Sequence, residues 1–201
     1  MKIITWLVPF FVIVWPLRAQ EPPKISTTQE GVVHRHEVEG HLASTRSLGC
    51  IALSEAKSSF TPPDLYGAVR ACIDRDDYDA SVALFALAGI YSRFDVERVA
   101  DKTAEQGIPV LIMNAFSHLS PDKKERFNAA LQRVTGTPAL RDTLCGTIRS
   151  IGMPDYYPNY LILHGIKAFM GTPPPADLVV DFDRQQVWES LQSTYLNCLS
   201  R

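Results

Sequence analysis

The stretch Val82-Ala83-Leu84-Phe85-Ala86-Leu87-Ala88-Gly89-Ile90-Tyr91 decides the fold, because ten consecutive residues carry no charge and nearly all are apolar. A helix with no polar face belongs in the middle of a bundle. The run is too short and too rich in alanine for a membrane span, and Asp and Arg residues bracket it. We therefore predict a core helix over 78–93.

Three helix starts share one chemistry, namely Thr61-Pro62, Ser120-Pro121 and Thr137-Pro138. The hydroxyl can cap an unpaired backbone N–H, and proline at the first helical position has no N–H to lose. Asp64 and Asp122 add a carboxylate in the first turn, where the helix dipole favours negative charge. These pairs predict helix boundaries at 62, 121 and 138.

Helical periodicity continues on both sides of the core helix, whereas only Leu178-Val179-Val180 is strand-like, and that stretch is short and isolated. About eight helices with short connections imply an all-α, antiparallel helical array. Gly107-Ile108-Pro109 should break or kink the chain. The expected helical segments are 41–57, 62–75, 78–93, 94–106, 110–119, 121–134, 138–151, 161–170 and 183–199.

The N-terminus has the layout of a secretory signal. Lys2 is followed by an almost continuously apolar run from Ile3 to Trp15, and Arg18-Ala19 closes it. We expect residues 1–19 to be a signal peptide, 20–40 a flexible N-terminal arm and 41–201 a single α-helical domain. The expected location is periplasmic or secreted, with no stable membrane anchor after cleavage, although a retained anchor is the alternative.

All four cysteines, Cys50, Cys72, Cys145 and Cys198, lie in the mature part. An even number behind an export signal predicts disulfides, because the destination is oxidising. Four cysteines allow three pairings. We favour Cys50–Cys72 and Cys145–Cys198, since each pair joins neighbouring helices at one end of the chain. Four free buried thiols are the alternative, and the wide spacings argue against zinc.

The charge balance argues against nucleic acid as a partner. The whole chain has a net charge of −2, and loss of residues 1–19 leaves 18 basic and 22 acidic residues, a net charge of −4. No cluster of Lys and Arg offers a footprint for a phosphate backbone. No glycine-rich phosphate loop or cofactor motif occurs, so we predict no cofactor.

Histidines offer the main catalytic alternative. His34, His36 and His41 lie with two glutamates within eight residues and could bind a metal, but the spacing is not that of a zinc protease and a mobile arm gives no fixed geometry. Solvated polar residues are the favoured interpretation. His118 and His164 are further candidates for a hydrolase or a metal-dependent enzyme.

The segment around Met153, Tyr156, Tyr157 and Tyr160 is the strongest candidate for partner binding. Tyrosines on a proline-stiffened loop offer apolar area with hydroxyl groups at a small entropy loss, as binding hot spots do. The alternative is that these tyrosines pack over the end of the bundle and cover the core.

The Ala-rich hairpins around 64–118, with helices that meet through tight corners, resemble tetratricopeptide or Sel1-like helical hairpins, although no regular repeat is present. In size, address and architecture the chain is similar to bacterial periplasmic immunity proteins. The resemblance implies a non-catalytic module that binds another protein, such as a toxin acting in the periplasm. A periplasmic hydrolase or metal-dependent enzyme that uses His34/His36/His41 or His118/His164 is the other hypothesis.

Overall fold

A computed structural model describes residues 24–30, 33–170 and 177–198. The predicted signal peptide and part of the proline-rich stretch after Met170 lie outside these residues. Eight α-helices dominate the described part, and the all-α prediction is confirmed. None of these helices is both long and apolar enough to cross a bilayer.

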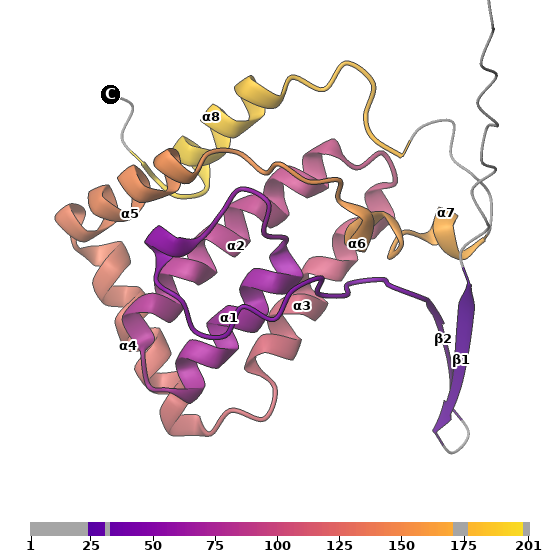
Figure 1. Ribbon diagram of the computed structural model, residues 1–201, viewed down its shortest axis with the longest axis horizontal. Coiled ribbons are helices and arrows are strands. Elements are labelled where there is room, and N and C mark those ends of the chain that lie inside the picture. Colours follow the sequence, from indigo (N-terminus) through magenta and orange to yellow (C-terminus); the bar gives the residue numbers. More distant parts are fainter. Residues whose placement is uncertain (1–23, 31–32, 171–176, 199–201) are drawn as a thin grey trace, which may run out of the picture.

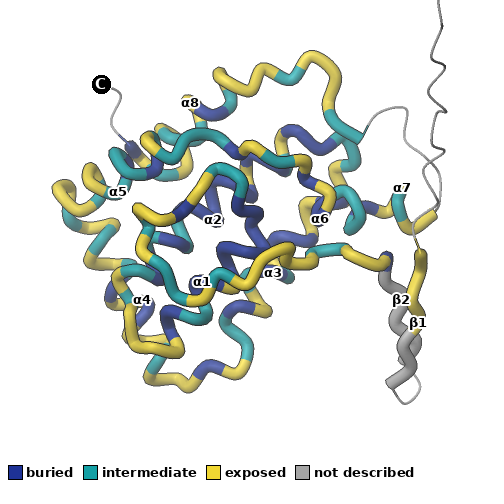
Figure 2. Tube along the Cα trace, in the orientation of Figure 1, coloured by how far each residue is buried: buried dark blue, intermediate teal, exposed yellow. Residues whose placement is uncertain are grey.

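The core helix is α2 (Tyr78–Arg98), which packs directly against several of the other helices (Figure 1). Its central residues Leu84, Leu87 and Ile90 are fully buried, and Figure 2 shows buried stretches along the tube of α2. α1 (Pro62–Asp74) pairs with it through a tight corner, and α3 (Gly107–Phe116), α4 (Pro121–Gly136), α5 (Pro138–Ile151) and α8 (Arg184–Thr194) complete the array. The starts at 62, 121 and 138 are confirmed.

The predicted caps differ in chemistry. Ser120 Oγ accepts a hydrogen bond from Lys123 N as expected, but the Thr61 and Thr137 hydroxyls cap nothing among the described residues. At α1 the Asp64 carboxylate accepts the Thr61 N–H instead, at 3.0 Å. A first-turn carboxylate therefore stabilises the α1 start in place of the hydroxyl.

The helix expected over 41–57 is wrong. The chain there is irregular, with a single 3₁₀ turn at Leu53–Glu55. The backbone N–H groups of Thr45 and Arg46 donate to Asp64 Oδ1 at 2.7 and 2.9 Å, which takes them away from helical carbonyls. Gly49 has a φ of +65°, which a helix also excludes.

Three other boundaries differ from expectation. The segments 78–93 and 94–106 share one helix, which ends at Arg98 and is followed by a 3₁₀ stretch, Lys102–Gln106. Gly107-Ile108-Pro109 begins α3 rather than breaking a helix. A proline in the first turn of a helix is tolerated, because the N–H groups of that turn make no hydrogen bond within the helix. α8 ends at Thr194, before the expected 199.

The single helix expected over 161–170 is also wrong, since two short helices, α6 (Asn159–Ile162) and α7 (Ile166–Phe169), replace it. The backbone N–H of Ile166 donates to Thr103 Oγ1 and that of Lys167 to Asp101 Oδ2, both at 2.9 Å. Side chains from the segment after α2 therefore take the amides that would continue α6.

The N-terminal arm contains two strands that the sequence did not predict. β1 (Ile25–Glu30) pairs antiparallel with β2 (Val33–Val38) in a hairpin that projects from the helices (Figure 1). Its residues are mostly polar, so the apolar alternation that reveals a strand is weak. The stretch Leu178-Val179-Val180 adds one isolated bridge, between Leu178 and Val99.

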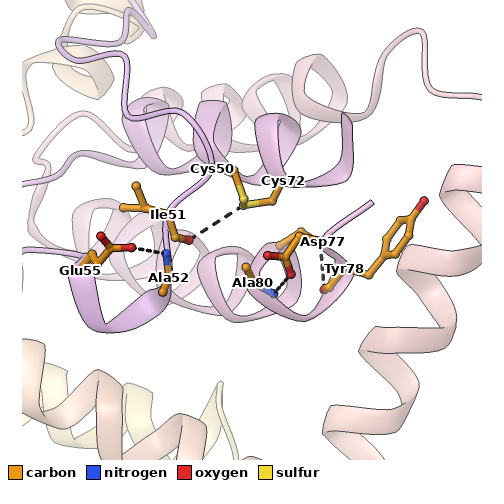
Figure 3. The surroundings of a disulfide bond; sticks show 9 residues. Cys50, Ile51, Ala52, Glu55, Cys72, Asp77, Tyr78 and Ala80 are labelled. Carbon is orange, nitrogen blue, oxygen red and sulfur yellow. Dashed lines mark hydrogen bonds between the residues drawn. A yellow bond between two sulfur atoms is a disulfide. The ribbon is translucent and has the colours of Figure 1, made fainter. Parts of the chain in front are cut away.

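Both favoured disulfides are confirmed. Cys50–Cys72 ties the irregular segment before α1 to the buried side of that helix (Figure 3), and Cys145–Cys198 ties α5 to the chain after α8. No cysteine of the chain is free. The two bonds close spans of 22 and 53 residues, so each restricts the unfolded chain.

Candidate binding face

A buried polar cluster lies at the end of α2. Asp95 and Arg98 face inward from its last turn, with 0% and 3% of their surface exposed. Arg98 Nε donates to Asp95 Oδ1 at 2.7 Å, and Arg98 Nη2 lies 2.7 Å from the same oxygen. Tyr156 and Tyr160 donate their hydroxyls to Asp95 Oδ2 at 2.9 and 2.7 Å. Both oxygens of the carboxylate are thus occupied.

Burial dominates the electrostatics of this cluster. Burial raises the pKa of the Asp95 carboxyl, while Arg98 and the hydroxyls of Tyr160 and Tyr156 act in the opposite direction. Burial, together with the negative charge of Asp95, raises the pKa of both tyrosines well above its usual range. The phenols therefore keep their protons and remain hydrogen-bond donors to the carboxylate.

The cluster fixes the loop that carries the tyrosines. Arg98 lies over the Phe94 ring at 5.4 Å and over the Tyr156 ring at 5.0 Å, as cation–π contacts require. One turn earlier on α2, the Tyr91 hydroxyl donates to Gly152 O at 2.8 Å. The loop over 152–160 is therefore attached to α2 at both of its ends.

The residues after α2 hold two more segments. Val179 N donates to Arg98 O at 2.8 Å, and Ala100 N donates to Asp177 O at 2.9 Å. On the other side, Asp101 and Thr103 bind the first amides of α7, as described above. Segment 98–103 therefore connects the 177–180 stretch and α7 to the core helix.

Exposed apolar side chains concentrate on the segments that this connection holds. Ten large apolar residues are exposed in the described chain, and six of them lie between 157 and 180. Scattered exposed apolar residues are ordinary, whereas a concentration of them marks an interaction site. We name this set of exposed residues, grouped by the segments that carry them, the binding face, which consists of Tyr157, Ile166, Phe169, Met170, Val179 and Val180.

The predicted partner-binding residues divide between the interior and the surface. Tyr156 and Tyr160 serve the Asp95 cluster, and Tyr160 is only 4% exposed. Met153 packs partly buried against the core. Tyr157 is 52% exposed and donates to Asp177 Oδ2 at 2.6 Å. The covering role that was the alternative thus describes two of the tyrosines, and Tyr157 is the one available to a partner.

Sequence reasoning missed Asp95 and Arg98. The signal was available, because an acid and a base three residues apart follow directly on a helix that is apolar on every side. Charges in such a position are rarely buried unless they are paired. Their tyrosine partners, however, lie 61 and 65 residues away and no spacing rule connects them.

The structure brings His41 and His164 together, but it does not bring His118 to that pair. His164 packs beside Gly107 at the start of α3, whereas His118 follows the end of that helix, and ten residues of helix span about 15 Å. His41 Nδ1 donates to Val38 O at 2.8 Å, and the His41 ring stacks on that of His164, with ring centroids 5.6 Å apart. His34 and His36 occupy register positions opposite Gln29 and Thr27. No set of three metal-binding side chains occurs among the described residues.

A second surface feature is a hollow of about 490 Å³ at the corner between α1 and α2, where it meets α4. Three aspartates line it, but two of them are already paired: Lys123 Nζ lies 3.1 Å from Asp76 Oδ1, and Arg133 contacts Asp79. The negative charge of this open corner is therefore largely neutralised.

Comparison of the chain with models of protein families, with curated proteins and with solved structures found no match. The likeness to tetratricopeptide hairpins and the outline likeness to immunity proteins therefore stay predictions.

Proposed function

We propose that this chain is exported and works outside the cytosol as a non-catalytic module that binds another protein. The disulfides support a location outside the cytosol, because such bonds persist in oxidising compartments. The leader-like N-terminus points the same way. The specific role we propose is that of an immunity protein or inhibitor directed against a toxin that acts in the periplasm.

The observation that carries the binding proposal is the binding face. Its apolar side chains lie on segments that are attached by hydrogen bonds to the rigid end of α2. A partner that covers them pays little ordering entropy, since the loop and α7 are already held in place. Large apolar contacts on a preformed surface are what binding hot spots require.

The decisive experiment compares the unchanged chain with variants of α7. Ile166 and Met170 are 53% and 68% exposed, so Ile166→Asp and Met170→Asp should leave the core intact while they place charge in the contact. Leu140→Asp on α5, where Leu140 is 41% exposed, is the matched control.

The unchanged chain and the Leu140 variant should recover the same stoichiometric partner from a native periplasmic extract, and the α7 variants should not. In a calorimeter, the purified partner should bind the unchanged chain and the Leu140 variant with similar affinity, and the α7 variants more weakly. Recovery of no partner would reject the proposed function. A partner whose affinity is unaffected by both α7 substitutions would reject the binding face.

A further inference from the structure

A tyrosine and an aspartate form a pair of hydrogen-bond acceptors on the segments of the binding face. The Tyr157 hydroxyl donates to Asp177 Oδ2 at 2.6 Å, and Tyr157 is 52% exposed. Partial burial of the phenol, together with this hydrogen bond and the negative charge of Asp177, raises the pKa of Tyr157 to about 12, so the phenol keeps its proton at neutral pH. The lone pairs of Tyr157 Oη and of Asp177 Oδ1 are then available as acceptors.

The charge of Asp177 is not neutralised within the described part of the chain. No basic side chain of those residues forms an ion pair with it, and the Tyr157 hydroxyl is the one group there that donates to its carboxylate. The backbone of Asp177 is fixed, since its carbonyl accepts the Ala100 N–H at 2.9 Å. The protein therefore holds this carboxylate in place and leaves one of its oxygens open.

The surroundings of this pair carry a net negative charge. The stretch 152–183 contains four acidic residues and one basic residue, namely Asp155, Asp177, Asp181, Asp183 and Lys167. Asp155 and Asp181 are exposed, and their side chains make no hydrogen bond or ion pair among the described residues. A field of this sign is repelled by an anionic bilayer surface and attracts a cationic partner.

A guanidinium group suits this acceptor pair better than an ammonium group does. It is planar and presents several N–H donors in a fixed fork, so it can donate to Asp177 Oδ1 and Tyr157 Oη together, whereas an ammonium group is a compact point charge. The exposed ring of Tyr157 also offers a face on which a guanidinium stacks. Arginine is among the residues that dominate the energy of protein interfaces.

We infer that the binding face takes an arginine of the partner protein, whose guanidinium binds Asp177 and Tyr157 while apolar side chains next to it pack on α7 and Val179. Neighbouring residues of the chain hold these segments, because Ala100 N donates to Asp177 O and Asp101 Oδ2 accepts the Lys167 N–H. The inference rests on the proposed function, since it states the chemistry of the partner at the same face.

Two capped tripeptides test the inference without the natural partner. Acetyl-Ile-Arg-Ile-amide carries the guanidinium, and the same tripeptide with citrulline in place of arginine has nearly the same shape without the charge. Each is titrated into the disulfide-bonded chain and followed by NMR of the backbone amides. The arginine tripeptide should bind with a dissociation constant of about 1 mM and shift the signals of 157, 166–170 and 177–180. The citrulline tripeptide should bind about tenfold more weakly.

Asp177→Asn is the main variant, because its amide oxygen still accepts the Tyr157 hydroxyl while the charge is lost. It should weaken binding of the arginine tripeptide about tenfold and leave that of the citrulline tripeptide unchanged. Tyr157→Phe removes one acceptor and keeps the ring, so it should weaken the arginine tripeptide about threefold. Asp181→Asn is the matched control, since it removes the same charge from an exposed position, and it should change the affinity less than about twofold at physiological salt.

Three results would overturn the inference. The first is equal affinity for the two tripeptides, or no binding of either. The second is an equal loss in the Asp177→Asn and Asp181→Asn variants, because the effect would then reflect overall charge. The third is binding of the chain to vesicles of phosphatidylcholine and phosphatidylglycerol that Ile166→Asp abolishes, since the face would then contact lipid. The proposed function has its own test, the recovery of a stoichiometric partner, so the two failures are distinguishable.

Discussion

Replacement of Arg98 by methionine should lower the free energy of unfolding by about 3 kcal/mol. This change removes the guanidinium from a carboxylate that has 0% of its surface exposed. Loss of one partner of a buried ion pair typically costs about 3–5 kcal/mol, because the other charge stays buried without compensation. We expect the lower end, since Tyr156 and Tyr160 still donate to Asp95 Oδ2.

The double variant Asp95→Leu/Arg98→Met separates the charge from the packing. Asp95→Leu alone leaves a buried guanidinium and also removes the acceptor of the two tyrosine hydroxyls, so it should cost more than Arg98→Met. The double variant buries no charge and loses mainly the acceptor of the two tyrosine hydroxyls, at about 1–3 kcal/mol for each unsatisfied group. The two single costs should therefore exceed the cost of the double variant by roughly 2 kcal/mol or more.

Denaturant unfolding of the oxidised chain, followed by circular dichroism at neutral pH, measures these values. Arg126→Met is the control, because Arg126 pairs with Asp122 on the surface, where both side chains are more than half exposed, and it should change stability by less than about 1 kcal/mol. The reasoning is refuted if Arg98→Met costs no more than this control, or if the Asp95 and Arg98 costs simply add.

Three further predictions concern the rest of the fold. Although burial alone would raise the pKa of Asp64, hydrogen bonds from Ser44, Thr61 and the backbone of 45–46 hold this pKa below its usual value of 3.8. The ionised carboxylate therefore stabilises the fold above about pH 4, and this contribution is lost as the pH falls through the lowered pKa. Asp64→Asn should flatten the dependence of stability on pH in that range, and an unchanged dependence would contradict the assignment. Reduction of Cys145–Cys198, which closes a span of 53 residues, should cost about 4 kcal/mol by the loop-entropy relation, as thermal unfolding of the Cys→Ser pair variant would measure, whereas an unchanged melting temperature would argue against it. Glycine-to-alanine changes inside a helix usually stabilise a protein, but Gly89→Ala should destabilise this fold, because the new methyl group would lie 2.9 Å from Cζ of the Tyr195 ring. The same substitution in a Tyr195→Ala background should stabilise the fold. A loss of equal size in both backgrounds would show that Tyr195 is not the cause.

Local chemistry was sufficient to predict the long helices. Proline at the first helical position marks 62, 121 and 138 correctly, and the uncharged run from Val82 to Tyr91 identifies the core helix. These signals are strong because they act over one or two turns and do not depend on distant residues. The favoured disulfide pairing was also correct, although α6 and α7 lie between the two segments that Cys145–Cys198 joins, 53 residues apart.

The errors occur where a distant side chain competes for backbone groups. The helix expected over 41–57 is absent because Asp64 takes its amides, and the helix over 161–170 is divided because Asp101 and Thr103 take those of α7. The candidate site shows the same limit. The sequence predicts a partner-binding role at the surface for Tyr156 and Tyr160. It does not show that Asp95, more than 60 residues earlier, accepts hydrogen bonds from their hydroxyls.

The sequence by itself determined the helical class, the core helix and the main helix starts, because periodicity and capping depend on residues that are close along the chain. It favoured the observed disulfide pairing among three possible ones. The tertiary structure alone decided which tyrosine faces solvent, where α7 begins and which apolar side chains stay exposed. Those outcomes depend on a buried carboxylate and on a few side-chain acceptors whose partners meet only when the chain folds. A buried polar group must find a partner, and folding determines which one it finds.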